Sequence, residues 1–318
     1  MKKRIALQIV FIAIFGLILY VIFKDVSYSA LKRAMRETNL LIFALVIPLY
    51  IFKQGLVASR FWLSSWLQAK GRVPIGQTLL FEFKLLFFEL ALPLPNIEDV
   101  IRYFYLRYIG ISVSSRILSI FYVRVSGLLA LSLIFCLSIY ELTGTYIQNQ
   151  HVLIFLVVFT ILWLIVLVSN RKAHSWIIEL IPKESKLKSW LRLVKLKSIE
   201  IDKLMVLALI ALGHLAFWAL VWKIICVAVG LSISYYQVLI FVPFMVLSFM
   251  VPASFQGLGL PEASFYFYLT GLGYNENLAL AACILHFLLY LTLIIIGAIL
   301  SILDTKGFGL YQFLRWRK

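Results

Sequence analysis

Charged side chains stand among apolar residues in two stretches of this sequence, and the two stretches share a pattern. The first reads DVIRYFYL at residues 99–106 and is followed by Gly110, whereas the second reads EASFYFYL at residues 262–269 and is followed by Gly273. Each begins with a carboxylate and contains the same aromatic run, and proline-containing sequence precedes both. A repeated pattern of this kind predicts an internal duplication.

The first stretch suggests an anion-binding site. The guanidinium group of arginine presents a planar fork that forms two parallel, charge-assisted hydrogen bonds with a phosphate. We predict that Arg102, with Arg107 or Arg124, binds the phosphate of an anionic head group. The alternative is structural: Arg102 follows Asp99 by about one helical turn, so the two side chains can pair, or the arginines extend to the membrane interface.

A turn that breaks a helix precedes the second stretch. Pro252 ends the incoming helix, and Gly257 and Gly259 permit positive φ angles or a close backbone approach. Glu262 begins the outgoing helix, whose free backbone amides form an end that favours anions. Three roles are open for Glu262: a cap on these amides, a contact with a cationic group, or a proton carrier.

Glu89 and His286 are the candidates for a proton relay. A lone intramembrane histidine can carry protons, and it can equally be a hydrogen-bonded packing residue. Trp218 and Trp222 are one helical turn apart, and we interpret them as interfacial anchors. The sequence shows no nucleophile–base constellation, no nucleotide-binding motif and no metal-ligand spacing, so we expect no catalytic residue, cofactor or metal.

Composition indicates an integral membrane protein. The chain has 318 residues, of which 63% are hydrophobic and 14% charged. Soluble domains contain roughly 45–50% apolar and about 25% charged residues, and several runs here approach the roughly 20 apolar residues that span a bilayer. The net charge of +16 favours membrane orientation and contact with anionic lipids over binding of nucleic acid.

We predict an all-α integral membrane protein with about six full transmembrane helices and two re-entrant helical hairpins. The full helices are placed at about 5–23, 39–58, 115–140, 151–169, 204–229 and 277–303. Segments 75–110 and 235–272 are also apolar, but proline and polar residues interrupt each near its centre. Such an interruption predicts two half-helices, and non-helical backbone at membrane depth requires surrounding protein or a wet cavity.

Lysine and arginine predict the orientation. The longest loop, about 170–203, is strongly basic and is therefore expected on the cytoplasmic side. Both termini then lie in the cytoplasm, and we expect a multi-pass protein of the cytoplasmic (inner) membrane. Residues 24–38 are basic as well but fall on the outer side, so we expect an amphipathic helix at the interface there.

The whole chain, 1–318, forms one polytopic membrane domain in this prediction. Repeat unit one covers about 39–140 and repeat unit two about 204–303, and the hairpins of the two units enter the membrane from opposite sides. Transporters with inverted repeats are built in this way, with broken helices near the bilayer midplane. We therefore expect the two hairpin tips to meet at a polar cavity inside the bundle.

The sequence resembles the lysylphosphatidylglycerol synthase transmembrane region, also called the flippase-like domain family, over roughly residues 1–305. The family's first motif is a proline turn followed by an acidic residue, two arginines and a glycine. Its counterparts here are Pro93, Pro95, Asn96, Asp99, Arg102, Arg107 and Gly110. A later Glu-Arg pair followed by Asp is matched only by Arg124. The second motif, Pro then Gly-Gly-x-Gly-x-x-Glu, has as counterparts Pro252, Gly257, Gly259 and Glu262, with Gln256 at the first glycine.

The resemblance implies a stand-alone lipid-translocating module that lacks the family's aminoacyl-transferring domain. The predicted function is the flipping of an anionic phospholipid or a polyprenyl-phosphate-linked lipid, so membrane lipids are the expected partners. Two alternatives remain open: an integral-membrane transferase with Asp99 or Glu98 as its base, and a non-catalytic partner in a cell-envelope assembly. Homo-oligomerisation is also left open.

Overall fold

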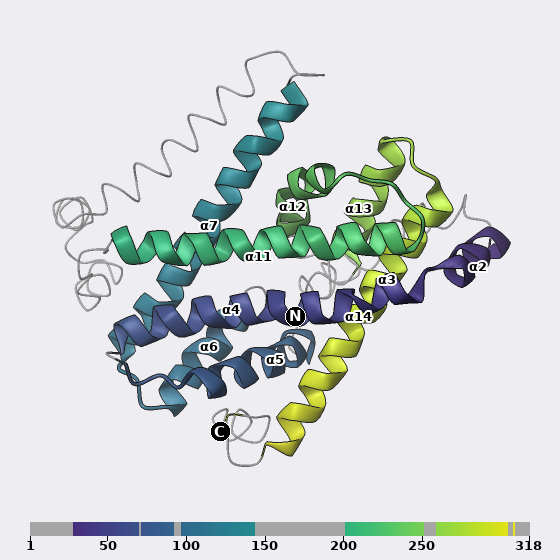
Figure 1. The fold of residues 1–318 in the computed structure, drawn as a ribbon. Helices are drawn as coiled ribbons and strands as arrows, with labels where there is room; N and C mark the ends of the chain where they lie inside the picture. The colour runs from purple at the N-terminus through teal and green to yellow at the C-terminus, as the bar shows by residue number, and fades with distance from the viewer. Residues whose placement is uncertain are drawn as a thin grey trace, which may run out of the picture. The chain divides into compact units, whose positions relative to one another are not determined.

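The computed structural model describes residues 28–69, 71–91, 97–143, 201–250, 259–304 and 308, which form helices joined by short turns (Figure 1). In chain order the helices are α2 (Tyr28–Glu37), α3 (Leu40–Ala44), α4 (Val46–Gln68), α5 (Ile75–Ala91), α6 (Ile97–Tyr108), α7 (Val113–Thr143), α11 (Ile201–Ala228), α12 (Tyr235–Met250), α13 (Leu260–Gly271) and α14 (Glu276–Leu303). The predicted helices 5–23 and 151–169, most of the basic loop and both termini lie outside the described residues.

Four helical stretches in these ranges are long and apolar enough to cross a membrane. They are Leu40–Gln68, Val113–Ser138, Asp202–Ala228 and Glu276–Leu303. Large apolar side chains stay exposed on them, such as Ile295, Ile299 and Ile302 along one face of α14. A helix that is apolar on its exposed face as well is typical of a membrane span. The described part of the chain is all-helical, and the protein is a multi-pass membrane protein.

Each segment predicted as a hairpin contains two short helices. Residues 75–110 form α5 and α6, and residues 235–272 form α12 and α13. The helix pairs are therefore confirmed, whereas their re-entrant placement in the membrane stays a prediction. The basic segment before the first described span forms α2, in which Ala34 is buried and Lys32 and Arg33 are exposed, the distribution of an amphipathic helix.

Helices of similar length follow one another in the same order twice. A long helix, two short helices and a second long helix occur as α4–α7 and again as α11–α14. The chain also leaves the second short helix in the same way both times, through Gly110 (φ 80°) and Gly273 (φ 83°). The amide of Ile111 bonds to the carbonyl of Leu106 at 2.9 Å, as Tyr274 does to Leu269 at 3.1 Å.

These bonds define a Schellman end, in which glycine adopts the left-handed conformation that other residues avoid. The two stretches that share a sequence pattern thus share a helix end as well. An inverted arrangement of the two halves remains a prediction.

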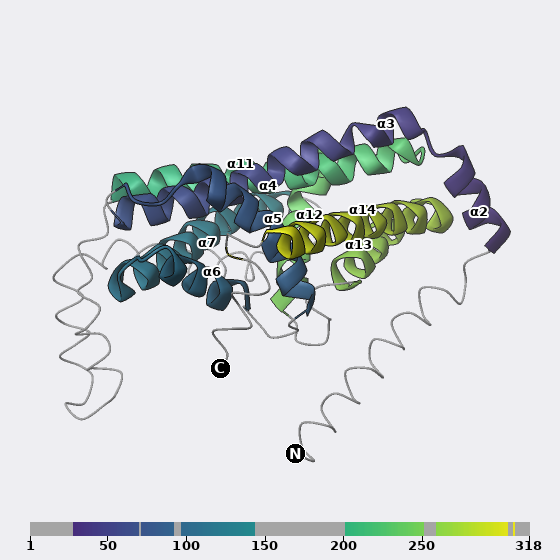
Figure 2. The same cartoon turned by 90° about the horizontal axis from the view of Figure 1, so that it is seen from below.

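The chain divides into two compact units. The first unit comprises the described residues within 1–54, 80–98 and 215–318, and the second those within 55–79 and 99–214. In the first unit, α12 packs on α13, α13 on α14, and α14 on α2; Figure 2 shows α13 beside α14. The first half of α4 runs along the last part of α11 in both views, and the rings of Phe52 and Phe217 are 4.6 Å apart.

Helices α14 and α5 of the first unit approach each other backbone to backbone. A Cβ atom on Gly297 would lie less than 3.0 Å from the carbonyl oxygen of Phe83 and 3.5 Å from the amide nitrogen of Phe87. Lys84, which is 2% exposed, forms an ion pair with Asp304 at the end of α14. Because an unpaired buried charge is strongly destabilising, this pair also holds α14 against α5.

In the second unit, α4 continues ten residues beyond its predicted end at 58. The prediction was wrong because this part of α4 carries polar residues, which we interpreted as a loop. The structure buries them: Ser64 donates to the carbonyl of Ser119 at 2.8 Å, and Ser115 donates to the carbonyl of Gln68 at 3.0 Å. Hydrogen bonds to the neighbouring helix α7 therefore accompany the extension of the span.

We predict that Gly297→Ala destabilises the protein, because the added methyl group overlaps the backbone of α5. Overpacking of this kind costs about 1–3 kcal/mol, and the thermal unfolding midpoint of the detergent-solubilised protein should fall accordingly.

Gly55→Ala is the matched control for this change. Gly55 lies within α4, and a Cβ there meets nothing within 4 Å, so alanine should leave the midpoint unchanged or raise it. Equal midpoints for the two variants would show that α14 does not approach α5 as described.

Candidate functional site

Two arginines of the second unit lie close to Asp99 on α6. Its Oδ2 atom accepts a hydrogen bond of 2.7 Å from Nε of Arg124 on α7. Its Oδ1 atom lies 3.8 Å from Nη1 of Arg102 on the next turn of α6. One carboxylate thus stands between two arginines, so these three side chains carry a net positive charge. The predicted residues Asp99, Arg102 and Arg124 are brought together.

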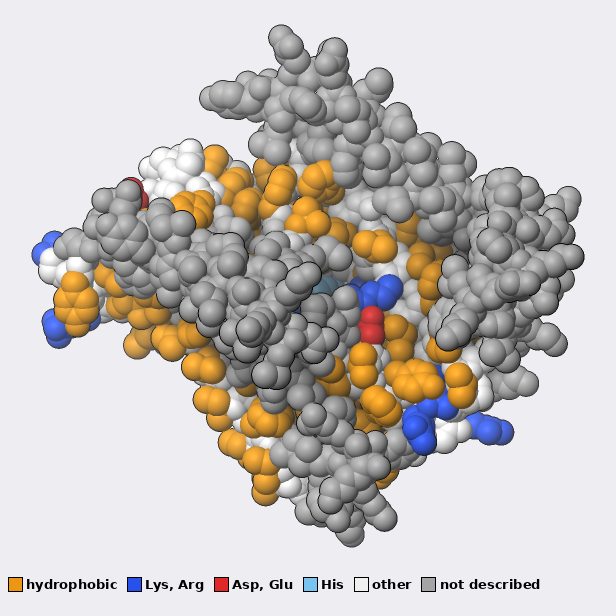
Figure 3. Space-filling model, turned by 180° about the vertical axis from the view of Figure 1, so that it is seen from behind, with side chains coloured by type: hydrophobic (Ala, Val, Ile, Leu, Met, Phe, Trp, Pro, Cys, Tyr) orange, Lys and Arg blue, Asp and Glu red, His pale blue; other side chains and the backbone are white. Residues whose placement is uncertain are grey.

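The three members of this cluster, which we call the Asp99 cluster, differ in exposure. The Arg102 side chain is 7% exposed and its guanidinium group lies over the ring of Phe61 at 5.3 Å. The side chains of Asp99 and Arg124 are 21% and 40% exposed. An anion can therefore reach Arg124 directly while Arg102 supports the site from the interior. Figure 3 shows a face on which a few basic and acidic side chains gather among hydrophobic ones.

Sequence reasoning missed Arg60, which lies beside the same part of α7. A Cβ atom on Gly127 would be 3.2 Å from Nη1 of Arg60, and Gly127 follows Arg124 by about one helical turn. We overlooked Arg60 because the predicted helix ended at 58, which placed Arg60 in a loop. A charged residue within an otherwise apolar segment is the sequence feature that could have identified Arg60.

Arg107 and Arg116 take no part in the contacts of Asp99 that the structure describes. Arg107 is exposed in the last turn of α6. Arg116 is buried, with its guanidinium group 4.5 Å from the ring of Tyr103. The predicted residues Asn96, Pro252 and Gly257 lie outside the described residues.

Glu262 lies at the start of α13 in the first unit, and both of its carboxylate oxygens are in use. Oε2 accepts a hydrogen bond of 3.1 Å from the amide of Gly259, which precedes the helix with φ 85°. Oε1 lies 2.8 Å from Nδ1 of His286 on α14. Glu262 is 8% exposed. It therefore caps α13 and pairs with His286, two contacts that join the turn before α13 to α14.

An aromatic ring packs against the imidazole of His286. The ring of Trp222 on α11 stacks on the imidazole at 3.9 Å with an interplanar angle of 16°. Trp222 is fully buried and Trp218 is 6% exposed, so the interpretation of these two residues as interfacial anchors is wrong. Nε2 of His286 and Nε1 of Trp222 are buried without a hydrogen-bond partner.

Glu89, the other candidate for a proton relay, lies on α5 among polar groups of the first unit. It acts electrostatically on Tyr50 and Lys53 of α4 and on Tyr290 of α14. Glu262 acts on the same two tyrosines. Lys53 is 8% exposed, and its ammonium group lies 4.2 Å from the centre of the Tyr50 ring. The two carboxylates therefore share Tyr50 and Tyr290 as neighbours.

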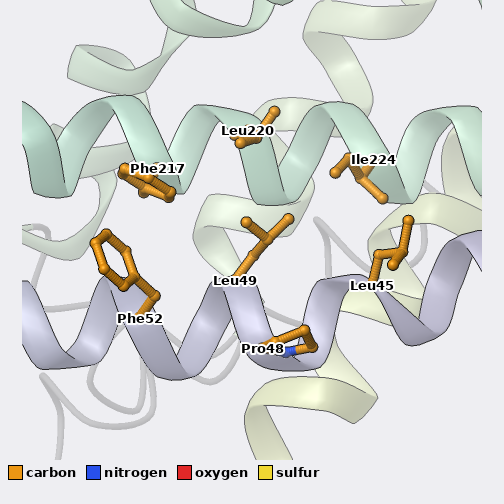
Figure 4. Close-up of a pocket in the computed structure, with 7 residues that line it drawn as sticks. All are labelled: Leu45, Pro48, Leu49, Phe52, Phe217, Leu220 and Ile224. Carbon is orange, nitrogen blue, oxygen red and sulfur yellow. The ribbon is translucent and has the colours of Figure 1, made fainter.

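An apolar groove lies elsewhere in the first unit, between α11 and the segment that contains the end of α3 and the start of α4. The residues that line it are Leu45, Pro48, Leu49, Phe52, Phe217, Leu220 and Ile224 (Figure 4). All of these side chains are apolar, so the groove offers no group for proton transfer or anion binding. It suits a lipid tail or an apolar side chain.

The sequence model of the lysylphosphatidylglycerol synthase TM region matches residues 5–297, nearly the whole chain. The chain belongs to this family. The match includes the Asp99 cluster and the Glu262–His286 pair, so both sites lie in the membrane region that defines the family. Membership is consistent with a lipid-related role in a membrane and confirms the resemblance found in the motifs. No curated protein matches the chain.

We predict that Glu262→Ala destabilises this member of the family by about 1–3 kcal/mol, the penalty for leaving buried polar groups without partners. The amide of Gly259 and Nδ1 of His286 both lose a hydrogen-bond partner. The measurement is the thermal unfolding midpoint in detergent.

Glu276→Ala is the matched control, because Glu276 also lies in the first turn of a helix but is exposed. Its loss should change stability by less than about 1 kcal/mol, the usual range for a charge near a helix N-terminus. If Glu262→Ala is as mild as this control, the two bonds of Glu262 contribute little.

Proposed function

We propose that this protein flips an anionic lipid, either a phospholipid or a polyprenyl-phosphate-linked lipid, across the cytoplasmic membrane. The observation that carries the proposal is the Asp99 cluster, in which two arginines share one carboxylate. A charged residue in a transmembrane segment is unfavourable by roughly 2.5–3.5 kcal/mol at a helix centre. An arginine kept there, as Arg124 is on α7, is suited to an anionic ligand.

The geometry of the cluster supports phosphate recognition. Nε of Arg124 is bonded to Asp99, while the Arg124 side chain remains 40% exposed. An incoming phosphate can bind the exposed part of this guanidinium group. Asp99 orients Arg124 before the phosphate arrives, which reduces the entropy lost on binding.

Glu262 and Gly259 contribute differently in this proposal. Both oxygens of Glu262 are engaged. The residue therefore positions the start of α13 and does not contact the lipid head group. Movement of the two halves of the chain then provides alternating access, as in inverted-repeat transporters.

The test uses the purified protein in liposomes that contain a fluorescent phosphatidylglycerol in both leaflets. Dithionite bleaches only the outer leaflet, so the extent of bleaching reports lipid exchange. We expect wild type to exchange the lipid and Arg124→Ala to slow exchange roughly tenfold to a hundredfold. That range corresponds to the loss of a charge-assisted hydrogen bond of about 1.5–3 kcal/mol.

Arg72→Ala is the matched control, because Arg72 is an exposed arginine of the same unit and lies in the turn after α4. It should leave exchange unchanged. Exchange no faster than in protein-free liposomes would contradict the proposal. A new lipid species formed in vesicles that also contain a lipid-linked sugar as donor, detected by mass spectrometry and lost in Asp99→Asn, would favour the transferase alternative instead.

A further inference from the structure

We infer that the Glu262–His286 pair binds a proton whose uptake and release are coupled to lipid movement. The inference rests on the proposed function and adds to it the ion that drives transport. It is drawn from the contacts of this pair, which belongs to the first unit. The arginines of the Asp99 cluster belong to the second unit.

The pair is a buried acid and base in direct contact. Oε1 of Glu262 and Nδ1 of His286 are 2.8 Å apart, and the two side chains are 10% and 5% exposed. In a low-dielectric interior the pair favours states of zero net charge, in which a proton is held either by the imidazole or between the two groups. A carboxylate and an imidazole in contact share protons as a unit, so the pair takes up and releases protons together.

One ring nitrogen of His286 can take up or release a proton. Nε2 is buried and has no hydrogen-bond partner. In the charged imidazole it carries an N–H group without an acceptor, and in the neutral imidazole it carries a lone pair without a donor. Neither state is fully satisfied, which reduces the free-energy difference between them. The stacked ring of Trp222 at 3.9 Å favours the charged form through its π-electrons.

Other ionisable or polar groups of the first unit act on the pair or on the residues that neighbour it. They are Tyr50 and Lys53 on α4, Glu89 on α5, Glu98 on α6, Trp222 and Cys226 on α11, and Cys283 and Tyr290 on α14. Tyr50 and Tyr290 interact with both Glu89 and Glu262. Glu89 and Glu262 therefore act on the same two tyrosines, so the charge of the pair is sensed by a second carboxylate site of the first unit.

The pair is also connected to the first turn of α13. Oε2 of Glu262 accepts the amide of Gly259, the residue that begins the turn into α13 with φ 85°. A carboxylate is a stronger acceptor than a protonated carboxyl group. Adding a proton to the pair therefore weakens the cap of α13, and losing one strengthens it. Protonation thus changes the stability of the start of α13.

The experiment imposes a pH difference across liposomes that contain the full-length protein and fluorescent phosphatidylglycerol, with the voltage held at zero by potassium and valinomycin. One proton moved per lipid should distribute the lipid unequally between leaflets, by up to about tenfold for each pH unit. Reversing the pH difference should reverse the distribution. A merely structural pair would leave the distribution even.

His286→Gln keeps a polar side chain of similar reach and removes the titrating imidazole. It should still exchange lipid when the pH is equal on both sides, but should show no leaflet asymmetry when the pH differs. His214→Gln is the matched control, because His214 also lies in a membrane-spanning helix, α11; it should behave like wild type.

The outcomes separate the two proposals. Wild type that exchanges lipid without any asymmetry overturns the proton coupling and leaves the proposed function standing. Asymmetry that persists in His286→Gln overturns the assignment to this pair. If wild type exchanges no lipid with or without a pH difference, the proposed function fails and the coupling fails with it. The wild-type measurements decide the coupling even if a variant does not fold.

Discussion

Every charge in the interior of this protein needs a partner, because a low-dielectric surrounding penalises an unpaired ion by several kcal/mol. In the first unit Lys84 pairs with Asp304, and Glu262 with His286. In the second unit Arg124 pairs with Asp99. Each pair joins residues of different elements, so the contacts that neutralise charge also hold helices together. The same contacts therefore satisfy the need for charge pairing and contribute to helix packing.

The two sites differ in how exposed their paired charges are. The Asp99 cluster contains an arginine that is 40% exposed, which suits a ligand that carries negative charge. The Glu262–His286 pair is buried, can be neutral as a unit, and leaves only the Nε2 atom of His286 without a partner. An exposed arginine is suited to binding an anion, whereas a buried acid–base pair is suited to exchanging a proton. The division of roles that we propose follows from this difference.

Broken helices give both sites their position. Gly259 adopts a left-handed conformation directly before α13, and Glu262 then reaches back to its amide within one turn. Asp99 holds the corresponding place near the start of α6. Gly110 and Gly273 end these two short helices with the same pair of backbone bonds. A short helix with a carboxylate near its start and a glycine at its end therefore occurs twice. The partner of the carboxylate differs: it is Arg124 for Asp99 and His286 for Glu262.

Local patterns were sufficient for much of this picture. Hydrophobic runs located the helices, because a membrane span needs a continuous apolar segment, and proline and glycine located the breaks. The pair Asp99–Arg102 followed from helical spacing, and the family followed from its motifs. Long-range contacts required the folded chain: Glu262 meets His286 from a different helix, Trp222 lies under that histidine instead of at the interface, and Arg60 crosses α7 at Gly127. Sequence spacing describes neighbours on one helix, whereas the partner of a buried polar group is selected by how helices pack.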